Sequence, residues 1–195
     1  MRAARLVEPL RVRATHQDGY TLVELIAVLA IFLTIVTALT TLFVSGSRAE
    51  LDANRRFEAQ QNARLALDRM RRELHCSSGI TNLDGSPLTA TPVAAIRVAL
   101  PSHCPSASGT ATTVDYQLVA NGASRWELER VQGGTPVPIA DHLTEDEAFT
   151  YTAASASSRA LLHVDFQVNV NPNEGWKTWR LVDDIVLRNT LRVDP

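Results

Sequence analysis

The sequence predicts an α+β protein, in which a long N-terminal helical spine packs on a small antiparallel β-sheet domain. Three observations lead to this prediction. Residues 25–44 form an apolar run of twenty residues without a charge, and a helical pattern of apolar residues continues to about His75. After Cys76 the chain changes to short β-like runs separated by Ser, Thr, Gly and Pro. A helix followed by a series of strands is typical of the α+β class.

The apolar run is long enough to cross a membrane. At about 1.5 Å per residue, twenty helical residues span roughly 30 Å, the thickness of the hydrocarbon core of a bilayer. A core helix of a soluble protein would carry a polar stripe, whereas only four threonines interrupt this surface. An uncleaved signal anchor remains an alternative, but an ordinary secretory signal has a shorter apolar region and a small-x-small exit. Four arginines before the run place its N-terminal end in the cytoplasm: Arg2, Arg5, Arg11 and Arg13.

The charge of the chain is unevenly distributed. The 195 residues carry a formal net charge of −2. Residues 1–19 contribute four arginines against Glu8 and Asp18, a balance of +2, so the chain from Tyr20 onward sums to −4. Because a negative domain is not attracted to phosphate backbones, we predict no nucleic-acid partner.

The junction before the apolar run reads Gly19-Tyr20-Thr21-Leu22-Val23-Glu24. This hexapeptide resembles the class III signal of type IV prepilins and type II secretion pseudopilins, position by position. The resemblance implies that a prepilin peptidase cuts between Gly19 and Tyr20 on the cytoplasmic face, and that Tyr20 is then N-methylated. Glycine suits the cut physically, because a backbone without a Cβ can thread a protease cleft closely.

Glu24 needs its own explanation, because a carboxylate at the edge of a membrane span is costly unless it is paired or faces water. One interpretation places it at the cytoplasmic interface, facing water. The family resemblance instead implies that Glu24 pairs with the N-terminal amine of a neighbouring subunit. Such a pair inside a filament would set the axial register between subunits.

The chain is therefore expected to have four segments. Residues 1–19 are a basic leader that is removed, and 20–47 are a transmembrane and filament-core helix. Residues 48–76 are the amphipathic second half of the helix, and 77–195 are an extracytoplasmic β-rich domain. An apolar stripe on the amphipathic half is expected to pack on the domain: Ala53, Phe57, Ala63, Leu67, Met70 and Leu74.

The β-rich part contains six strand candidates. The clearest, residues 161–170, alternates apolar and polar side chains and indicates a strand with one buried face. The remaining candidates are residues 93–100, 113–119, 126–131, 148–152 and 179–187. Residues 77–92, 102–112 and 171–175 are expected to be loops.

Two cysteines are expected to form a disulfide, Cys76–Cys104, because the predicted topology puts both outside the cytoplasm. Two free thiols are the alternative. A zinc site with His75 and His103 is disfavoured, because the close Cys spacing of zinc sites is absent. The acidic residues Asp141, Glu145, Asp146 and Glu147 are interpreted as a solvated loop rather than a Ca²⁺ site. No metal, cofactor or catalytic residue is predicted, and His142 and His163 are interpreted as surface or strand-face residues.

The rest of the chain narrows the resemblance. The helix segment QNARLALDRMRREL, residues 114–118, a strand with Trp126 and the closing run 181–189 look like PilW-type minor pilins and the J-type pseudopilin of type II secretion. Major pilins often carry a helix-breaking Pro near the position of Thr41, and its absence here favours a minor subunit.

The predicted function is therefore a minor pilin or pseudopilin that primes filament assembly, not an enzyme. A filament-tip binding module (an adhesin or DNA-uptake pilin) is the alternative, and a membrane-anchored enzyme is disfavoured. The resemblance implies a prepilin peptidase, sister pilins, membrane lipid before assembly, and an inner-membrane platform with its cytoplasmic ATPase as partners. It implies a single-pass inner-membrane protein that then joins a filament at the cell surface. The machine, whether type IV pilus, competence pilus or secretion pseudopilus, stays open.

Overall fold

The computed structural model describes residues 19–155, 157–171 and 177–188. Most of the predicted leader therefore lies outside the described residues, as do residues 172–175 of the predicted loop 171–175 and residue 189 of the closing run. The chain divides into two compact units, Met1–Arg48 and Ala49–Pro195. We describe each unit by itself.

A single helix, α1, runs from Leu22 to Cys76 and confirms the predicted spine. Within the first unit its apolar side chains are exposed. The threonines of the apolar run bind back to their own helix: each hydroxyl donates to a carbonyl three or four residues earlier, at 2.7–2.8 Å. This bonding leaves no hydroxyl proton unsatisfied, which explains how four threonines fit in an apolar helix surface.

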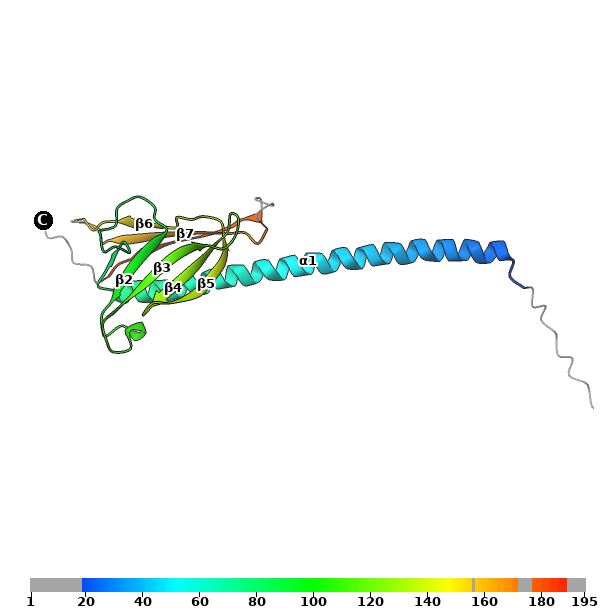
Figure 1. Cartoon of the computed structure of the whole chain (residues 1–195). Helices are drawn as coiled ribbons and strands as arrows, with labels where there is room; N and C mark the ends of the chain where they lie inside the picture. Colours follow the sequence, from blue (N-terminus) through cyan, green and yellow to red (C-terminus); the bar gives the residue numbers. More distant parts are fainter. Residues whose placement is uncertain (1–18, 156, 172–176, 189–195) are drawn as a thin grey trace, which may run out of the picture. The chain divides into compact units, whose positions relative to one another are not determined.

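The second unit contains an antiparallel sheet of eight strands. Its order is β1-β2-β3-β4-β5-β7. One edge of β7 pairs with β8, and the opposite edge pairs with both β5 and β6. Figure 1 shows most of these strands beside the C-terminal part of α1. The bounds are β1 Gly79–Thr81, β2 Ala95–Leu100, β3 Thr112–Ala120, β4 Trp126–Gln132, β5 Thr135–Leu143, β6 Phe149–Thr152, β7 Leu161–Val168 and β8 Trp179–Val186, with a short 3₁₀ helix, η1, at Pro105–Ala107.

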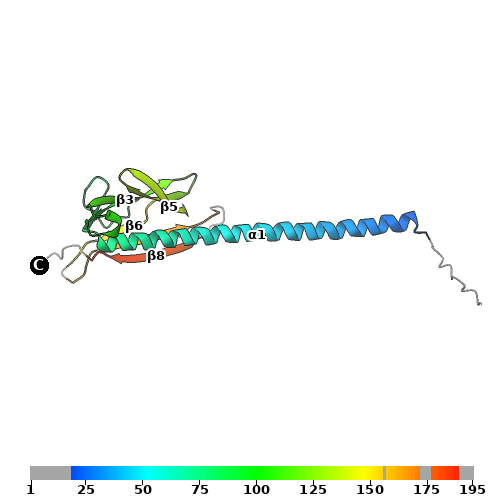
Figure 2. The same ribbon diagram turned by 90° about the horizontal axis from the view of Figure 1, so that it is seen from below.

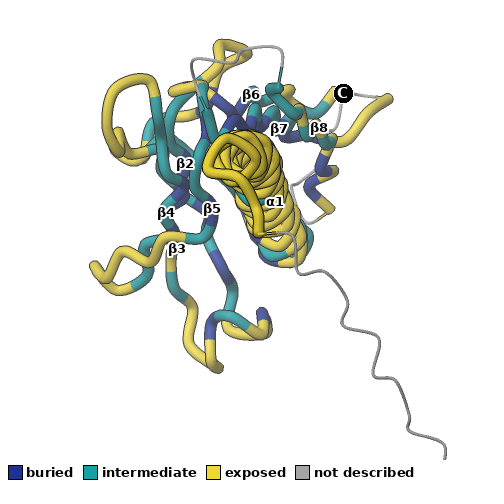
Figure 3. The backbone as a smooth tube through the Cα atoms, turned by 90° about the vertical axis from the view of Figure 1, so that its right-hand side faces the viewer, coloured by how far each residue is buried: buried dark blue, intermediate teal, exposed yellow. Residues whose placement is uncertain are grey.

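The sheet curls around the C-terminal part of α1, so that β3–β5 and β8 lie on different sides of the helix (Figures 2 and 3). Phe149 and Phe166 meet edge to face within the core, with ring centroids 6.3 Å apart. Half of the apolar side chains that the helix buries in this core are alanines, which lets the curled sheet approach the helix closely there. The apolar residues of α1 that are buried are Ala59, Ala63, Ala66, Leu67, Met70 and Leu74.

The predicted stripe on α1 begins too early. Ala53 is exposed, and Phe57 is 67% exposed. Phe57 precedes Met70 by thirteen residues, so at about 100° per residue it points about 140° away from the buried face. Ala59, which the prediction omitted, is buried instead.

All six predicted strands are present, with ends shifted by one or two residues. The alternation in β7 is confirmed, because Leu162, Val164 and Phe166 are buried and the polar residues between them are not. However, β7 ends at Val168, and Asn169, predicted to face solvent, is buried.

Two strands were not predicted. The short β1 lies in a segment interpreted as a loop, and so does the end of β5, which contains Asp141 and His142. The sequence of β5 does not predict a strand, because it contains prolines at 136 and 138 and proline normally ends a strand. The β4–β5 turn, Gly133-Gly134, has φ values of 60° and 80°, the left-handed pair that a two-residue hairpin needs.

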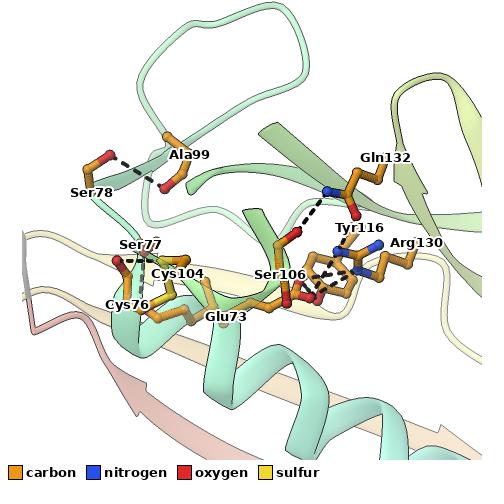
Figure 4. The surroundings of a disulfide bond; sticks show 11 residues. Glu73, Cys76, Ser77, Ser78, Ala99, Cys104, Ser106, Tyr116, Arg130 and Gln132 are labelled. Carbon is orange, nitrogen blue, oxygen red and sulfur yellow. Dashed lines mark hydrogen bonds and ion pairs between the residues drawn. A yellow bond between two sulfur atoms is a disulfide. The ribbon is translucent and has the colours of Figure 1, made fainter. Parts of the chain in front are cut away.

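A disulfide joins Cys76, the last residue of α1, to Cys104, just before η1, with Cα atoms 5.8 Å apart (Figure 4). Neither sulfur is then available as a zinc-binding thiolate. The link ties the end of the helix to the segment between β2 and β3. Because 28 residues separate the two cysteines, the bond greatly restricts the unfolded chain.

Replacing both cysteines (Cys76→Ser with Cys104→Ser) is expected to lower the free energy of unfolding of the β-domain by about 3–4 kcal/mol, the loop-closure value for a loop of this size. Urea unfolding of the full-length chain in detergent, followed by tryptophan fluorescence, measures the loss. A reductant should destabilise the wild type by a similar amount and leave the double variant unchanged. Equal stability of the oxidised wild type and the double variant would contradict the prediction.

Candidate functional site

The N-terminal segment places its key residues at the very start of α1. Gly19, Tyr20 and Thr21 precede the helix, and Tyr20 is 83% exposed. The Thr21 hydroxyl oxygen accepts a hydrogen bond from the backbone N–H of Glu24 at 3.2 Å. Thr21 is thus the N-cap of the helix. As a result, the Gly19–Tyr20 peptide bond lies outside the helix, in backbone that is accessible to another protein.

Glu24 lies in the first turn of α1, three residues after the cap. A carboxylate at this position is favoured by the positive end of the helix dipole. The side chain is exposed, and within the described residues its carboxylate has no hydrogen bond or ion pair. The carboxylate is therefore available to a cation from outside the chain.

The first part of α1, residues 25–44, carries no charged side chain on any side. By length and composition, the described residues include one helix that could cross a membrane, and none of its most apolar stretch is buried within the chain. An apolar surface of this size needs lipid or other helices around it. This helix and the capped segment before it are the candidate functional site.

The described part of the β-domain was compared with the sites considered from sequence. Among the described residues, no group of three or more His, Cys, Asp or Glu side chains could hold a metal ion. His163 lies on β7, with Nδ1 2.6 Å from Asp184 Oδ1. Trp179 packs against the core and stacks under the Arg64 guanidinium, 5.2 Å from the ring centroid.

A buried ion pair between helix and sheet was missed by sequence reasoning. Glu73 of α1 is 2% exposed and Arg130 of β4 is 4% exposed, and the two lie 3.0 Å apart. The Tyr116 hydroxyl of β3 donates to the same carboxylate (Figure 4). Gln132 extends the network by accepting from Arg130 at 2.8 Å and donating to the Ser106 carbonyl at 2.9 Å. The network therefore connects α1, two strands and η1 beside the disulfide.

The hydrogen bonds of this network keep the Glu73 carboxylate charged. Burial alone would raise the pKa of the Glu73 carboxyl, but hydrogen bonds from Arg130, Tyr116 and Ser106 outweigh burial and hold that pKa below its ordinary value. Burial, together with the Glu73 charge, raises the pKa of Tyr116. The sequence did contain a signal for this buried charge, because Glu73 lies three residues after Met70, on the buried face of the helix.

A comparison with protein families matches residues 15–40 to the family described as "Prokaryotic N-terminal methylation motif". The matched segment contains Gly19, Tyr20, Thr21 and Glu24 and ends inside the apolar part of α1. No curated protein and no solved structure matches the chain. The β-domain lies outside the matched segment.

Substituting Glu73→Gln is expected to destabilise the β-domain by about 3–5 kcal/mol at pH 7, because the buried Arg130 guanidinium loses its counter-charge. The folded pKa of Glu73 is lowered, so its stabilisation is complete above the ordinary carboxyl pKa of about 4.3 and is lost as the pH falls through the lower folded value. The difference between wild type and variant should therefore shrink below about pH 4.

Urea unfolding at a series of pH values measures both effects. Glu58→Gln, at an exposed position of the same helix, is the control and should change stability little. A difference between wild type and Glu73→Gln that stays constant down to low pH would contradict the assignment.

Proposed function

The chain is a prepilin-type protein by its N-terminal methylation motif and long apolar helix, and from this premise we propose that it is a minor pilin or pseudopilin. In this role it is a structural subunit that primes assembly of a pilus-like filament. The observation that carries the proposal is the capped segment Gly19–Glu24, placed directly before an exposed apolar helix. Pilin-type proteins are generally structural, and we propose no catalysis by this chain.

In the proposed sequence of steps, the chain is first inserted in the inner membrane. Its basic N-terminal end stays in the cytoplasm, the apolar part of α1 crosses the bilayer, and the β-domain lies outside. A prepilin peptidase removes residues 1–19 and Tyr20 is methylated. An assembly platform with its cytoplasmic ATPase then moves the subunit from lipid into a filament with other pilins, where residues 20–47 enter the filament core.

Cleavage would give Glu24 a partner. A cut after Gly19 creates a positive amine on Tyr20, four residues before Glu24. The amine of one subunit and the free carboxylate of Glu24 in its neighbour would attract strongly in an apolar filament core. A subunit out of register would leave both charges unpaired there, so the pair would select the correct axial position.

Substituting Gly19→Val is expected to block cleavage, so that the chain keeps its leader and is absent from filaments. The structure has no heavy atom within 4 Å of a Cβ placed on Gly19, so the substitution should leave the fold unchanged. Gly46→Ala is the matched control, because Gly46 also has open space around it and lies within α1. Intact mass of the membrane-bound chain measures processing, and normal cleavage of Gly19→Val would contradict the proposed processing site.

Substituting Glu24→Gln is expected to leave cleavage intact and to reduce filament incorporation at least about tenfold, because a neutral amide does not balance the amine. The cap is retained, since it uses the backbone N–H of residue 24. Glu50→Gln, at an exposed position of the same helix, is the control. Quantitative immunoblotting of sheared filaments against membranes measures incorporation. Equal incorporation of Glu24→Gln and wild type would remove the proposed role of Glu24.

A further inference from the structure

The strand β8 is an edge of the sheet with free backbone groups. The N–H of Leu187 donates to the Ala160 carbonyl at 2.9 Å, so Leu187 points its backbone groups toward β7. In an antiparallel pair the direction alternates from residue to residue. The backbone groups of four residues therefore point away from β7: Arg180, Val182, Asp184 and Val186.

One end of this edge is closed. The Val186 carbonyl accepts a hydrogen bond from Nδ1 of His75 at 3.1 Å. In the described part of the chain, no backbone group pairs with the outward N–H and C=O groups of Arg180, Val182 and Asp184. Arg180, Val182 and Asp184 are all exposed, so another chain can reach this edge.

The other edges of the sheet are short or blocked. The outward positions of β5 include Pro136 and Pro138, which have no N–H to donate. On the outer side of β6, Val93 exchanges both backbone hydrogen bonds with Phe149. The strand β1 has three residues. Prolines and short strands are the usual protection of sheet edges, and β8, with eight residues, lacks both.

From this asymmetry, and resting on the proposed function, we infer that β8 binds an extended strand of a different prepilin-type subunit in the filament. Alternating N–H and C=O groups along an extended chain are recognised by another extended backbone, the mode known as strand addition. The added strand would bind beside Arg180, Val182 and Asp184 and end where His75 covers Val186.

The side chains of this edge indicate that backbone bonds, rather than charge, hold the partner. Arg180 pairs with Asp165 at 2.6 Å, and Asp184 lies 2.6 Å from the His163 ring. Arg180 thus already has its counter-charge on β7, and the Asp184 carboxylate already has a polar partner there. Val182, between them, offers a short apolar contact to the added strand.

A second copy of this chain does not fit the edge, although antiparallel pairing around Val182 would match Arg180 with Asp184. Arg64 of α1 contacts Trp179 of β8, and Arg71, further along the helix, contacts Asp183, further along the strand (Figure 2). The helix and β8 therefore run in the same direction, and antiparallel pairing of two copies would point their helices in opposite directions. Parallel pairing would put the helices on opposite faces of the joint sheet. Neither arrangement suits subunits that leave one membrane together.

The test uses the full-length chain in cells with its assembly machinery, with a photo-crosslinking amino acid in place of Asp184. Val182→Pro removes the outward N–H of residue 182, whereas Val182→Thr keeps it. The N–H of residue 182 makes no hydrogen bond in the β7–β8 ladder, so the Val182→Pro variant should still fold. Its melting temperature, compared with that of the wild type, checks this expectation. Arg180→Pro, also outward, is the second variant if Val182→Pro is destabilised.

We expect an adduct that mass spectrometry identifies as another prepilin-type chain. This adduct should fall at least about tenfold in Val182→Pro and persist in Val182→Thr. An adduct with a second copy of this chain, an adduct that Val182→Pro and Arg180→Pro leave unchanged, or no adduct in a chain that is cleaved and incorporated would each overturn the inference. A chain that is never cleaved after Gly19 would overturn the proposed function and this inference together.

Discussion

The exposed apolar surface at the start of α1 is the constraint on which the rest depends. Its side chains have no partner within the first unit, and water is a poor solvent for them. The surface must be covered by lipid or by similar helices. The threonine hydroxyls satisfy themselves within the helix, so the same surface is compatible with both surroundings. The proposed passage of the chain from a membrane into a filament requires this property.

The same helix is built differently where it meets the β-domain. Its buried face begins with alanines at 59, 63 and 66, which let the curled sheet close around the helix, and continues with Leu67, Met70 and Leu74. At the C-terminal end the disulfide of Cys76 ties the helix to the segment before η1, and Glu73 ties it to Arg130 of β4 and Tyr116 of β3. These links hold the helix in one position relative to the strands. The orientation of the β8 edge relative to the helix follows from them.

Local patterns predicted much of this fold. The helix bounds follow from one continuous helical pattern, and the buried face of β7 follows from strict alternation at Leu162, Val164 and Phe166. Non-local features were missed. Two prolines are tolerated in β5 only because that strand lies at an edge, which the local sequence cannot reveal. Glu73 finds Tyr116 and Arg130 more than forty residues later in the chain. Phe57 continues the helical period, but the period does not say where the sheet begins to cover the helix.

The candidate site was readable because its residues are contiguous, from Gly19 to Glu24, and need no distant partner for recognition. The proposed function depends on removal of the leader after Gly19 and on methylation of the new N-terminus, Tyr20. Tandem mass spectrometry of the N-terminal peptide from assembled protein tests both steps most directly. We expect a peptide that begins at Tyr20 and carries one methyl group on its amine. A mature chain that begins at Met1 or Arg2 would contradict the proposed function.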